Sequence, residues 1–260
     1  MNTLDTYIAG LNIRINHRYG YIARICANYL KKDDSEQTDD DGSMPDISVE
    51  VTDEDMEGEK KYLPEDPESV RHPAYIEAMA IFRKIAEALP RFGRFLMHGS
   101  AISVDGEGYI FTAPSGTGKS THVSLWRDLF GERAVMVNDD KPFIRVSDNG
   151  VFVCGSPWNG KHGLGANICV PLKAVCLLER GENNSISGIT SREAFPTLLK
   201  QSYRPHDPEM LRTTLGLIDR VSEQAGMYRL YCNMEPEAAM VSYGGMNGGI
   251  SGGISGGMNE

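Results

Sequence analysis

The chain has 260 residues, of which 40% are apolar, 24% charged and 8% aromatic. This composition is typical of a soluble globular protein and excludes collagen-like, fibrous and wholly disordered chains. The net charge is −10, but the acidic stretch at 33–69 alone carries −14, which leaves +4 on the rest. A mildly basic remainder suits an anionic small-molecule ligand, and it is too weak to predict nucleic-acid binding.

No stretch of residues is long and apolar enough to cross a bilayer, and the N-terminus lacks the pattern of a signal peptide. We therefore expect no membrane partner and a cytoplasmic location. The cysteines are odd in number and lack metal-ligand spacing, which predicts buried thiols in a reducing compartment. They are Cys26, Cys154, Cys169, Cys176 and Cys232.

The first part of the chain reads as a small, β-rich N-terminal segment over residues 1–70. Alternating apolar residues favour strands within 3–31 and over 47–51, and the acid-rich residues 33–45 between them predict a solvated loop. A helix is expected over 73–89, because Pro73 suits its first turn and its apolar residues recur on one face.

The following residues, 71–243, are expected to form a nucleotide-binding domain. Short apolar runs predict several strands, and the turn Asp148-Asn149-Gly150 predicts a hairpin. The expected strands cover 95–97, 101–104, 109–112, 134–137, 143–146, 151–154, 172–178 and 227–232. The expected helices cover 120–130, 207–225 and 235–243. Strands mixed with helices around a central sheet indicate an α/β or α+β fold.

The last residues, 244–260, form four tetrads that each open with Gly-Gly. Eight glycines in seventeen residues make a helix or strand entropically costly. We therefore expect a flexible tail.

The segment with the clearest function is APSGTGKST at 113–121, which follows one predicted strand and opens a predicted helix. That context is typical of a phosphate-binding loop, in which glycines let backbone N–H groups point at phosphate oxygens. The helix N-terminus adds partial positive charge. The predicted nucleotide-binding residues are Ser115, Gly116, Thr117, Gly118, Lys119, Ser120 and Thr121.

Two side chains of this loop have specific expected roles. Lys119 would reach the β- and γ-phosphates of ATP, and the Ser120 hydroxyl would be a ligand of Mg²⁺. The consensus has glycine where this chain has Ala113, but the Gly-x-Gly-Lys-Ser core is intact. The alternative is a glycine-rich turn that merely contains a lysine.

Two adjacent carboxylates, Asp139 and Asp140, follow the predicted strand 134–137. A carboxylate at the end of a strand near a phosphate loop is suited to hold the metal or the attacking group. Two adjacent carboxylates can also have separate roles, because one can accept a proton while the other binds Mg²⁺. The alternative interpretation is a solvated turn.

Residues 95–178 resemble the catalytic core of the HPr kinase/phosphorylase family and of related serine kinases. The resemblance rests on MHG at 97–99, SGTGKST at 115–121, VNDD at 137–140 and HGLGAN at 162–167. The same pieces are similar to ATP-dependent phosphoenolpyruvate carboxykinase, which shares the fold of that family. The resemblance therefore implies a phosphoenolpyruvate-carboxykinase/HPr-kinase-like core with a central mixed sheet.

The resemblance also implies roles for individual residues. His98 and Asp139 would handle protons, and Asp140 would lie near the metal. Lys161 could clamp the transferred phosphoryl group or could be a solvated lysine at a hairpin end, and both interpretations stay open. The acid that the family places before the glycine stretch is missing around Lys161, and residues 1–70 do not resemble the family's N-terminal domain. HPr is therefore a doubtful substrate.

We predict a Mg²⁺- and ATP-dependent phosphotransferase whose acceptor, by the resemblance, is a serine of a peptide or protein. Its catalytic residues would be Asp139, His98, Lys119 and Lys161, and Ser120 and Asp140 would hold the metal. One alternative is a small carboxykinase-like enzyme. Another is a non-catalytic nucleotide sensor, which would need no base. The sequence is compatible with a homo-oligomer and does not distinguish a monomer, a dimer and a hexamer.

Overall fold

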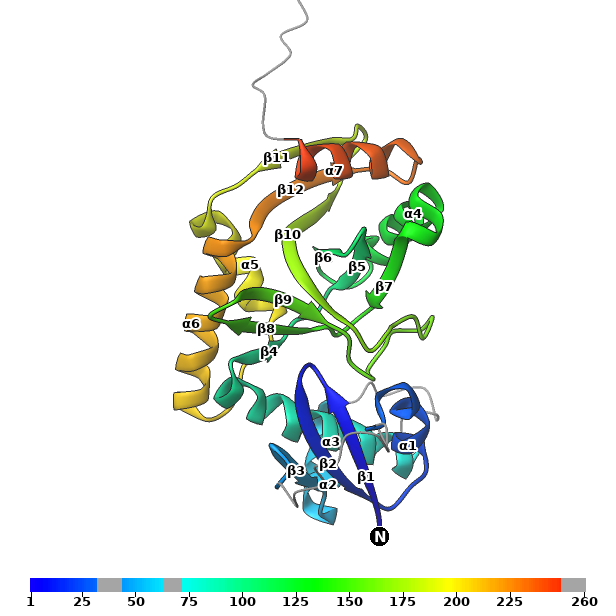
Figure 1. The fold of residues 1–260 in the computed structure, drawn as a ribbon, viewed down its shortest axis with the longest axis vertical. Coiled ribbons are helices and arrows are strands. Elements are labelled where there is room, and N and C mark those ends of the chain that lie inside the picture. Colours follow the sequence, from blue (N-terminus) through cyan, green and yellow to red (C-terminus); the bar gives the residue numbers. More distant parts are fainter. Residues whose placement is uncertain (32–43, 63–71, 249–260) are drawn as a thin grey trace, which may run out of the picture.

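The computed structural model describes residues 1–31, 44–62 and 72–248. Within them the chain forms a mixed α/β structure, in which a curled nine-stranded sheet carries helices and a three-stranded sheet lies at one end (Figure 1). The expected α/β class is therefore confirmed. Most of the acidic loop expected at 33–45 lies outside the described residues.

The N-terminal sheet consists of β1 (Asn2–Ile8), β2 (Leu11–His17) and β3 (Ile47–Glu50). β1 and β2 form an antiparallel hairpin, and β3 lies parallel to β2. The strand prediction for 3–31 is wrong beyond β2, because α1 (Tyr21–Ile25) and the 3-10 helix η1 (Ala27–Tyr29) follow. Ile22, Cys26 and Tyr29 are buried there at helical spacing.

Two helices complete this end of the molecule. Helix α2 (Asp53–Glu59) was not predicted, and it begins with a capping box between Thr52 and Asp55. The predicted helix α3 (Pro73–Ala88) is confirmed, and it passes into the 3-10 helix η4 (Leu89–Phe92). The buried face of α3 shares one hydrophobic cluster with β1, β2, β3 and Trp158. The N-terminal elements are thus packed onto a loop of the central part.

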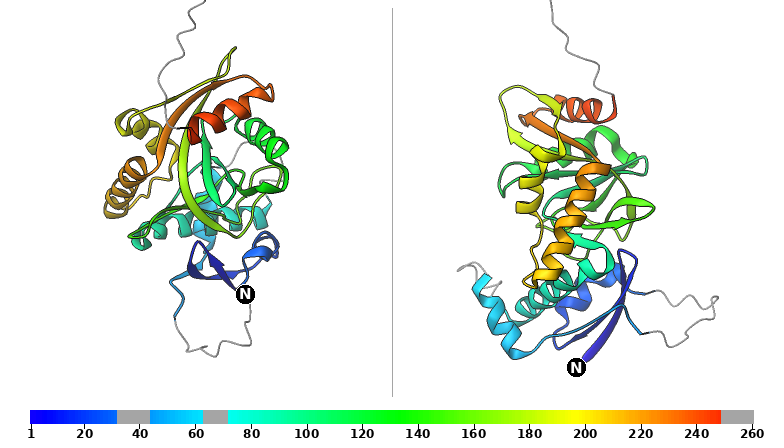
Figure 2. Two further views of the ribbon diagram at one scale, coloured as in Figure 1. Left: turned by 45° about the horizontal axis from the view of Figure 1, so that its top comes forward. Right: turned by 90° about the vertical axis from the view of Figure 1, so that its left-hand side faces the viewer.

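The central sheet confirms all the strands expected between residues 95 and 232. Its main path, in spatial order, is β4 (Arg94–Leu96), β8 (Phe143–Ser147), β9 (Gly150–Cys154), β10 (Cys169–Arg180), β6 (Glu107–Thr112), β5 (Ser100–Val104) and β7 (Ala134–Asn138). β12 (Gly226–Cys232) pairs with β10, and β11 (Ser185–Gly188) pairs with β12. Figure 2 shows how this sheet curls.

The direction of the strands brings several strand ends to one edge. β6, β10 and β12 are mutually parallel, and β7 runs the same way because β5 is antiparallel to both β6 and β7. β7 is the last strand of the path, and Val135 on it is 42% exposed. Ligands of α/β sheets bind outside the carboxyl ends of parallel strands, so this edge is where a site is expected.

The remaining helices flank the sheet: α4 (Lys119–Phe130), α5 (Ser191–Gln201), α6 (Pro208–Gln224) and α7 (Glu237–Asn247). Helix α5, which has Pro196 inside it, was not predicted. None of the described helices is long and apolar enough to span a membrane.

The prediction that the flexible tail begins at Gly244 is wrong, because α7 continues to Asn247. Tertiary contacts outweigh the entropic cost of glycine here. Met246 is buried, and the Tyr109 hydroxyl donates a 2.9 Å hydrogen bond to Oδ1 of Asn247. A Cβ at Gly245 would collide with Ile186, so glycine is required for this close approach of α7 to β11.

Candidate functional site

The predicted phosphate loop connects β6 to α4 at the carboxyl edge of the parallel strands. Gly116 and Gly118 have φ values of 78° and 123°, which favour glycine. Both the backbone N–H and the hydroxyl of Thr117 donate to the carbonyl of Pro114, which closes the turn. Helix α4 then starts at Lys119. The local structure is the strand–loop–helix that the motif requires.

Lys119 is the cation of this loop and is only 8% exposed. Its ammonium donates to the carbonyls of Ala113 (2.9 Å) and Pro114 (3.4 Å). Burial lowers the pKa of Lys119, and the nearby charge of Asp140 opposes that shift. Ser115, Gly116, Ser120 and Thr121 are exposed, while Thr117 and Gly118 are half-buried. The loop therefore presents its backbone to solvent and keeps its lysine beneath it.

Arg180, which the sequence analysis missed, also contacts this loop. It ends β10, the strand next to β6, and donates to the carbonyls of Gly116 (2.6 Å) and Thr117 (3.2 Å). The sequence predicted the strand before Arg180 but not that this strand pairs with β6, so the contact could not be predicted from the sequence.

The Asp139 carboxylate follows β7 and faces the phosphate loop across a cavity. Asp139 is 7% exposed, and its Oδ1 accepts a 2.6 Å hydrogen bond from the backbone N–H of Gly160. The Ser100 hydroxyl donates to its backbone carbonyl. A Cβ at Gly160 would lie 3.2 Å from Oδ2 of Asp139, so a larger residue would crowd this carboxylate. Hydrogen bonds thus hold both the carboxylate and the backbone carbonyl of Asp139 in place.

Asp140 is held by a different set of groups. Its carboxylate pairs with Lys141 and lies 3.4 Å from Nε2 of His98. Burial raises its pKa, but the hydrogen bond from His98 and the charge of Lys141 outweigh burial and lower the pKa to about 2. Nδ1 of His98 lies 2.9 Å from Oε1 of Gln201, which orients the ring. The structure therefore brings His98 to Asp140 rather than to Asp139.

Asn138, also missed by the sequence analysis, ties the aspartates to the loop 155–168. It is fully buried, and its amide donates to the Ser156 carbonyl and to Oδ1 of Asn159, both at 3.0 Å. Its own Oδ1 accepts from the backbone N–H groups of Asp140 and Lys141. Each strong polar atom of this amide is thereby satisfied, as a buried position requires.

A cavity of about 100 Å³ lies between α4, the end of β7 and the loop 155–168. Asp139 and Ser120 both line it. The full lining is Ser100, Ser120, Val123, Ser124, Arg127, Met136, Asp139, His162 and Leu164. Ser120 of the predicted phosphate loop and the predicted base Asp139 therefore share one cavity. The other predicted catalytic or metal-binding residues do not line it: His98, Lys119, Asp140 and Lys161, the last of which is exposed on the loop 155–168.

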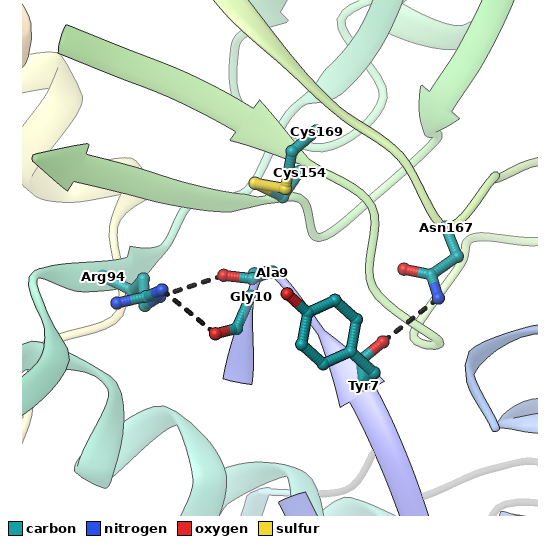
Figure 3. The surroundings of a disulfide bond; sticks show 7 residues. All are labelled: Tyr7, Ala9, Gly10, Arg94, Cys154, Asn167 and Cys169. Carbon is teal, nitrogen blue, oxygen red and sulfur yellow. Dashed lines mark hydrogen bonds between the residues drawn. A yellow bond between two sulfur atoms is a disulfide. The ribbon is translucent and has the colours of Figure 1, made fainter. Parts of the chain in front are cut away.

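A disulfide between Cys154 and Cys169 closes the loop 155–168 at its base (Figure 3). The prediction of free thiols is wrong for this pair, because the antiparallel register of β9 and β10 places the two residues directly opposite each other. Cys26, Cys176 and Cys232 are free and buried, as expected. The Tyr29 hydroxyl, which donates to the Ser156 carbonyl, and the Asn167 amide, which donates to the Tyr7 carbonyl, join the loop to the N-terminal elements.

The described residues contain no group of three or more His, Cys, Asp or Glu side chains that could enclose a metal ion. A hard cation here would need oxygen ligands from a nucleotide and from water in addition to protein groups. Mg²⁺ at nucleotide sites is bound in that way, through one or two carboxylates and substrate phosphates.

No family model and no curated protein matches the chain. A solved structure to which it is similar is the HPr(Ser) kinase/phosphatase from Coxiella burnetii. The two share 11% sequence identity with a TM-score of 0.33, over 57% of this chain and 91% of that one. Because this TM-score is low, no conclusion about this chain is drawn from the likeness, and the function has to be argued from the site itself.

Proposed function

We propose that the chain is an ATP-dependent phosphotransferase of the HPr-kinase-like type, which transfers the γ-phosphate to the hydroxyl group of a serine in a peptide or protein. The observation that carries the proposal is a juxtaposition at one sheet edge. The loop with Lys119 follows β6, Asp139 follows β7, and one cavity lies between Ser120 and Asp139. A loop that can bind phosphate and a carboxylate that can accept a proton would thus lie beside the same cavity.

The loop fits the triphosphate of a nucleotide. Lys119 is paired with neutral carbonyls, so its positive charge is available to an anion. The first N–H groups of α4 have no acceptor within the helix, and the helix dipole adds to their attraction for phosphate. Residues 115–121 would hold the phosphates through these groups.

Ser120 and Asp140 are the residues that would hold Mg²⁺. The Ser120 hydroxyl is exposed at the start of α4, and the low pKa of Asp140 keeps its carboxylate ionised. When bound, the metal spreads the negative charge of the phosphates. His98, hydrogen-bonded to Gln201, would act as a positioning residue by orienting Asp140.

In the transfer, Asp139 would accept the proton of the acceptor hydroxyl. The acceptor oxygen forms a bond to the γ-phosphorus, and the bond from that phosphorus to the bridging oxygen of the β-phosphate breaks, leaving ADP. The Gly160 N–H fixes the Asp139 carboxylate without protonating it. Lys161 stays in the proposal as a clamp for the transferring phosphoryl group, carried on the loop that contains Gly160.

The test is the conversion of ATP to ADP by the purified chain with Mg²⁺. It is run alone, with serine-containing peptides and with a protein extract, and phosphorylated products are identified by mass spectrometry. We expect ADP formation that an acceptor accelerates. ATP binding without ADP formation under all three conditions would identify a nucleotide sensor instead. Formation of phosphoenolpyruvate from oxaloacetate would identify a carboxykinase.

A further inference from the structure

The cavity beside Asp139 continues along one face of α4. Ser120, Val123, Ser124 and Arg127 line it, and their spacing of three, four and seven residues places them on the same side of the helix. Ser120 lies at the end near Asp139, and Arg127 lies two turns further along. The cavity therefore has a polar end where the phosphoryl group would arrive and a cationic end at Arg127.

Arg127 is exposed and has no carboxylate partner among the described residues. Five other arginines do form ion pairs within the described residues: Arg14, Arg18, Arg83, Arg133 and Arg229. A guanidinium group without a partner at the rim of a cavity is well suited to bind a carboxylate through paired hydrogen bonds.

We infer that this cavity is the acceptor site and that Arg127 recognises an acidic side chain near the phosphorylated serine. The inference rests on the proposed phosphotransferase function and adds the substrate class, an acidic peptide segment. In this arrangement the serine hydroxyl lies against Asp139, and the peptide runs along α4 toward Arg127.

The geometry of α4 sets the spacing between the serine and the acid. Seven residues of helix span roughly 10 Å, and long helical side chains lean back toward the N-terminus, which shortens the separation. An extended peptide advances by about 3.3 Å per residue. The acid is therefore expected two or three residues from the serine.

The lining of the cavity beside Asp139 includes the apolar side chains Val123, Met136 and Leu164. These side chains can pack against the Cβ of an acceptor serine while its hydroxyl lies against Asp139.

The inference is tested with synthetic peptides of one serine in an alanine and glycine background. Glu or Gln is placed one to four residues from the serine on either side, and kcat and KM are measured at saturating ATP and Mg²⁺. We expect the wild type to prefer Glu over Gln by about tenfold in kcat/KM at a spacing of two or three, mainly through KM.

Two substitutions sharpen the test. Arg127→Gln should remove the preference for Glu, and Arg127→Glu should reverse it in favour of peptides with Lys at the same position. Arg212→Gln, an exposed arginine on α6, is the matched control and should keep the wild-type preference.

Each outcome bears on the inference. Equal rates for Glu and Gln peptides, or a preference that survives both Arg127 substitutions, would overturn it and leave the phosphotransferase proposal intact. Turnover of ATP without phosphorylation of any peptide would also overturn it. The absence of ATP turnover with every acceptor would overturn the proposed function as well.

Discussion

The two walls of the candidate site are held in different ways. The first wall, residues 113–121, is one continuous stretch whose shape comes from glycine conformations and from the start of α4. The second wall combines His98, Asp139, Asp140, the loop 155–168 and Gln201, and distant contacts hold it together. We therefore expect changes in the first wall to affect nucleotide binding and changes in the second to affect transfer while ATP still binds.

The largest effect is expected at the first wall, in Lys119→Ala. On the proposed function, removing the ammonium takes away the charge that would face the β- and γ-phosphates, so turnover should be lost and ATP affinity should fall by about a hundredfold, measured by calorimetry. Lys200→Ala, on the exposed side of α5, is the matched control and should behave as the wild type. Normal turnover by Lys119→Ala would show that the loop does not hold the nucleotide.

The corresponding change in the second wall is Asp139→Asn. The amide has the size of the carboxylate and still accepts the hydrogen bond from Gly160, but it is a poor base. We expect transfer to slow by roughly 10²–10⁴-fold with ATP affinity unchanged. Asp128→Asn, exposed on α4, serves as the control. If ATP affinity also falls, Asp139 acts through the metal, and the roles of the two aspartates are exchanged.

A smaller effect is expected when the second wall is loosened at its base. The disulfide between Cys154 and Cys169 closes a loop with a sequence separation of 15 residues. On the chain-entropy model its loss costs about 3 kcal/mol of stability. We expect the Cys154→Ser, Cys169→Ser double variant to unfold at lower denaturant concentration and to transfer phosphate more slowly, because Gly160 holds Asp139 less firmly.

The same double variant separates the two walls. Its ATP affinity at a temperature where it is fully folded should equal that of the wild type. A loss of ATP affinity with unchanged transfer per bound nucleotide would contradict the division of roles.

The smallest effect concerns His122, on the buried side of α4. Burial lowers its pKa from 6.5 to about 4, and its Nε2 lies 2.9 Å from the Ser242 hydroxyl on α7. Between those two pH values the unfolded chain binds a proton that the folded chain does not, so stability falls as the pH falls. We expect a loss of about 1 kcal/mol from pH 7 to pH 5.5.

Denaturant titrations at the two pH values measure this loss. His122→Gln can keep a hydrogen bond to Ser242 but does not titrate, so the part of the pH dependence that comes from His122 should vanish in it. An identical pH dependence in both proteins would show that folding does not lower the pKa of His122.

The contrast between the walls also explains what could be predicted from the sequence. The predicted phosphate loop and the helix after it are specified by neighbouring residues, so the sequence pattern correctly predicted the strand, loop and helix at 107–130. The contacts of Arg180 and Asn138, by contrast, depend on which strands become neighbours in the sheet. The Cys154–Cys169 bond depends on the register of β9 and β10. Spacing along the chain contains none of this information.

Other differences arose where tertiary contacts outweigh local preference. The glycines of 244–247 are helical because Met246 is buried and α7 packs against β11. Pro196 inside α5 obscured a helix whose start is fixed by the capping box of Thr190 and Glu193. In both segments the composition disfavours a helix, but packing or capping stabilises one.

Hydrogen exchange with ATP and Mg²⁺ tests the central claim most directly, because it reports which backbone amides the nucleotide protects. We expect ATP to slow exchange at residues 115–121 in the wild type and in Asp139→Asn, and to have no such effect in Lys119→Ala. Wild-type protein whose exchange at 115–121 is unchanged at an ATP concentration that supports maximal ADP formation would contradict the account, because catalysis would then occur elsewhere.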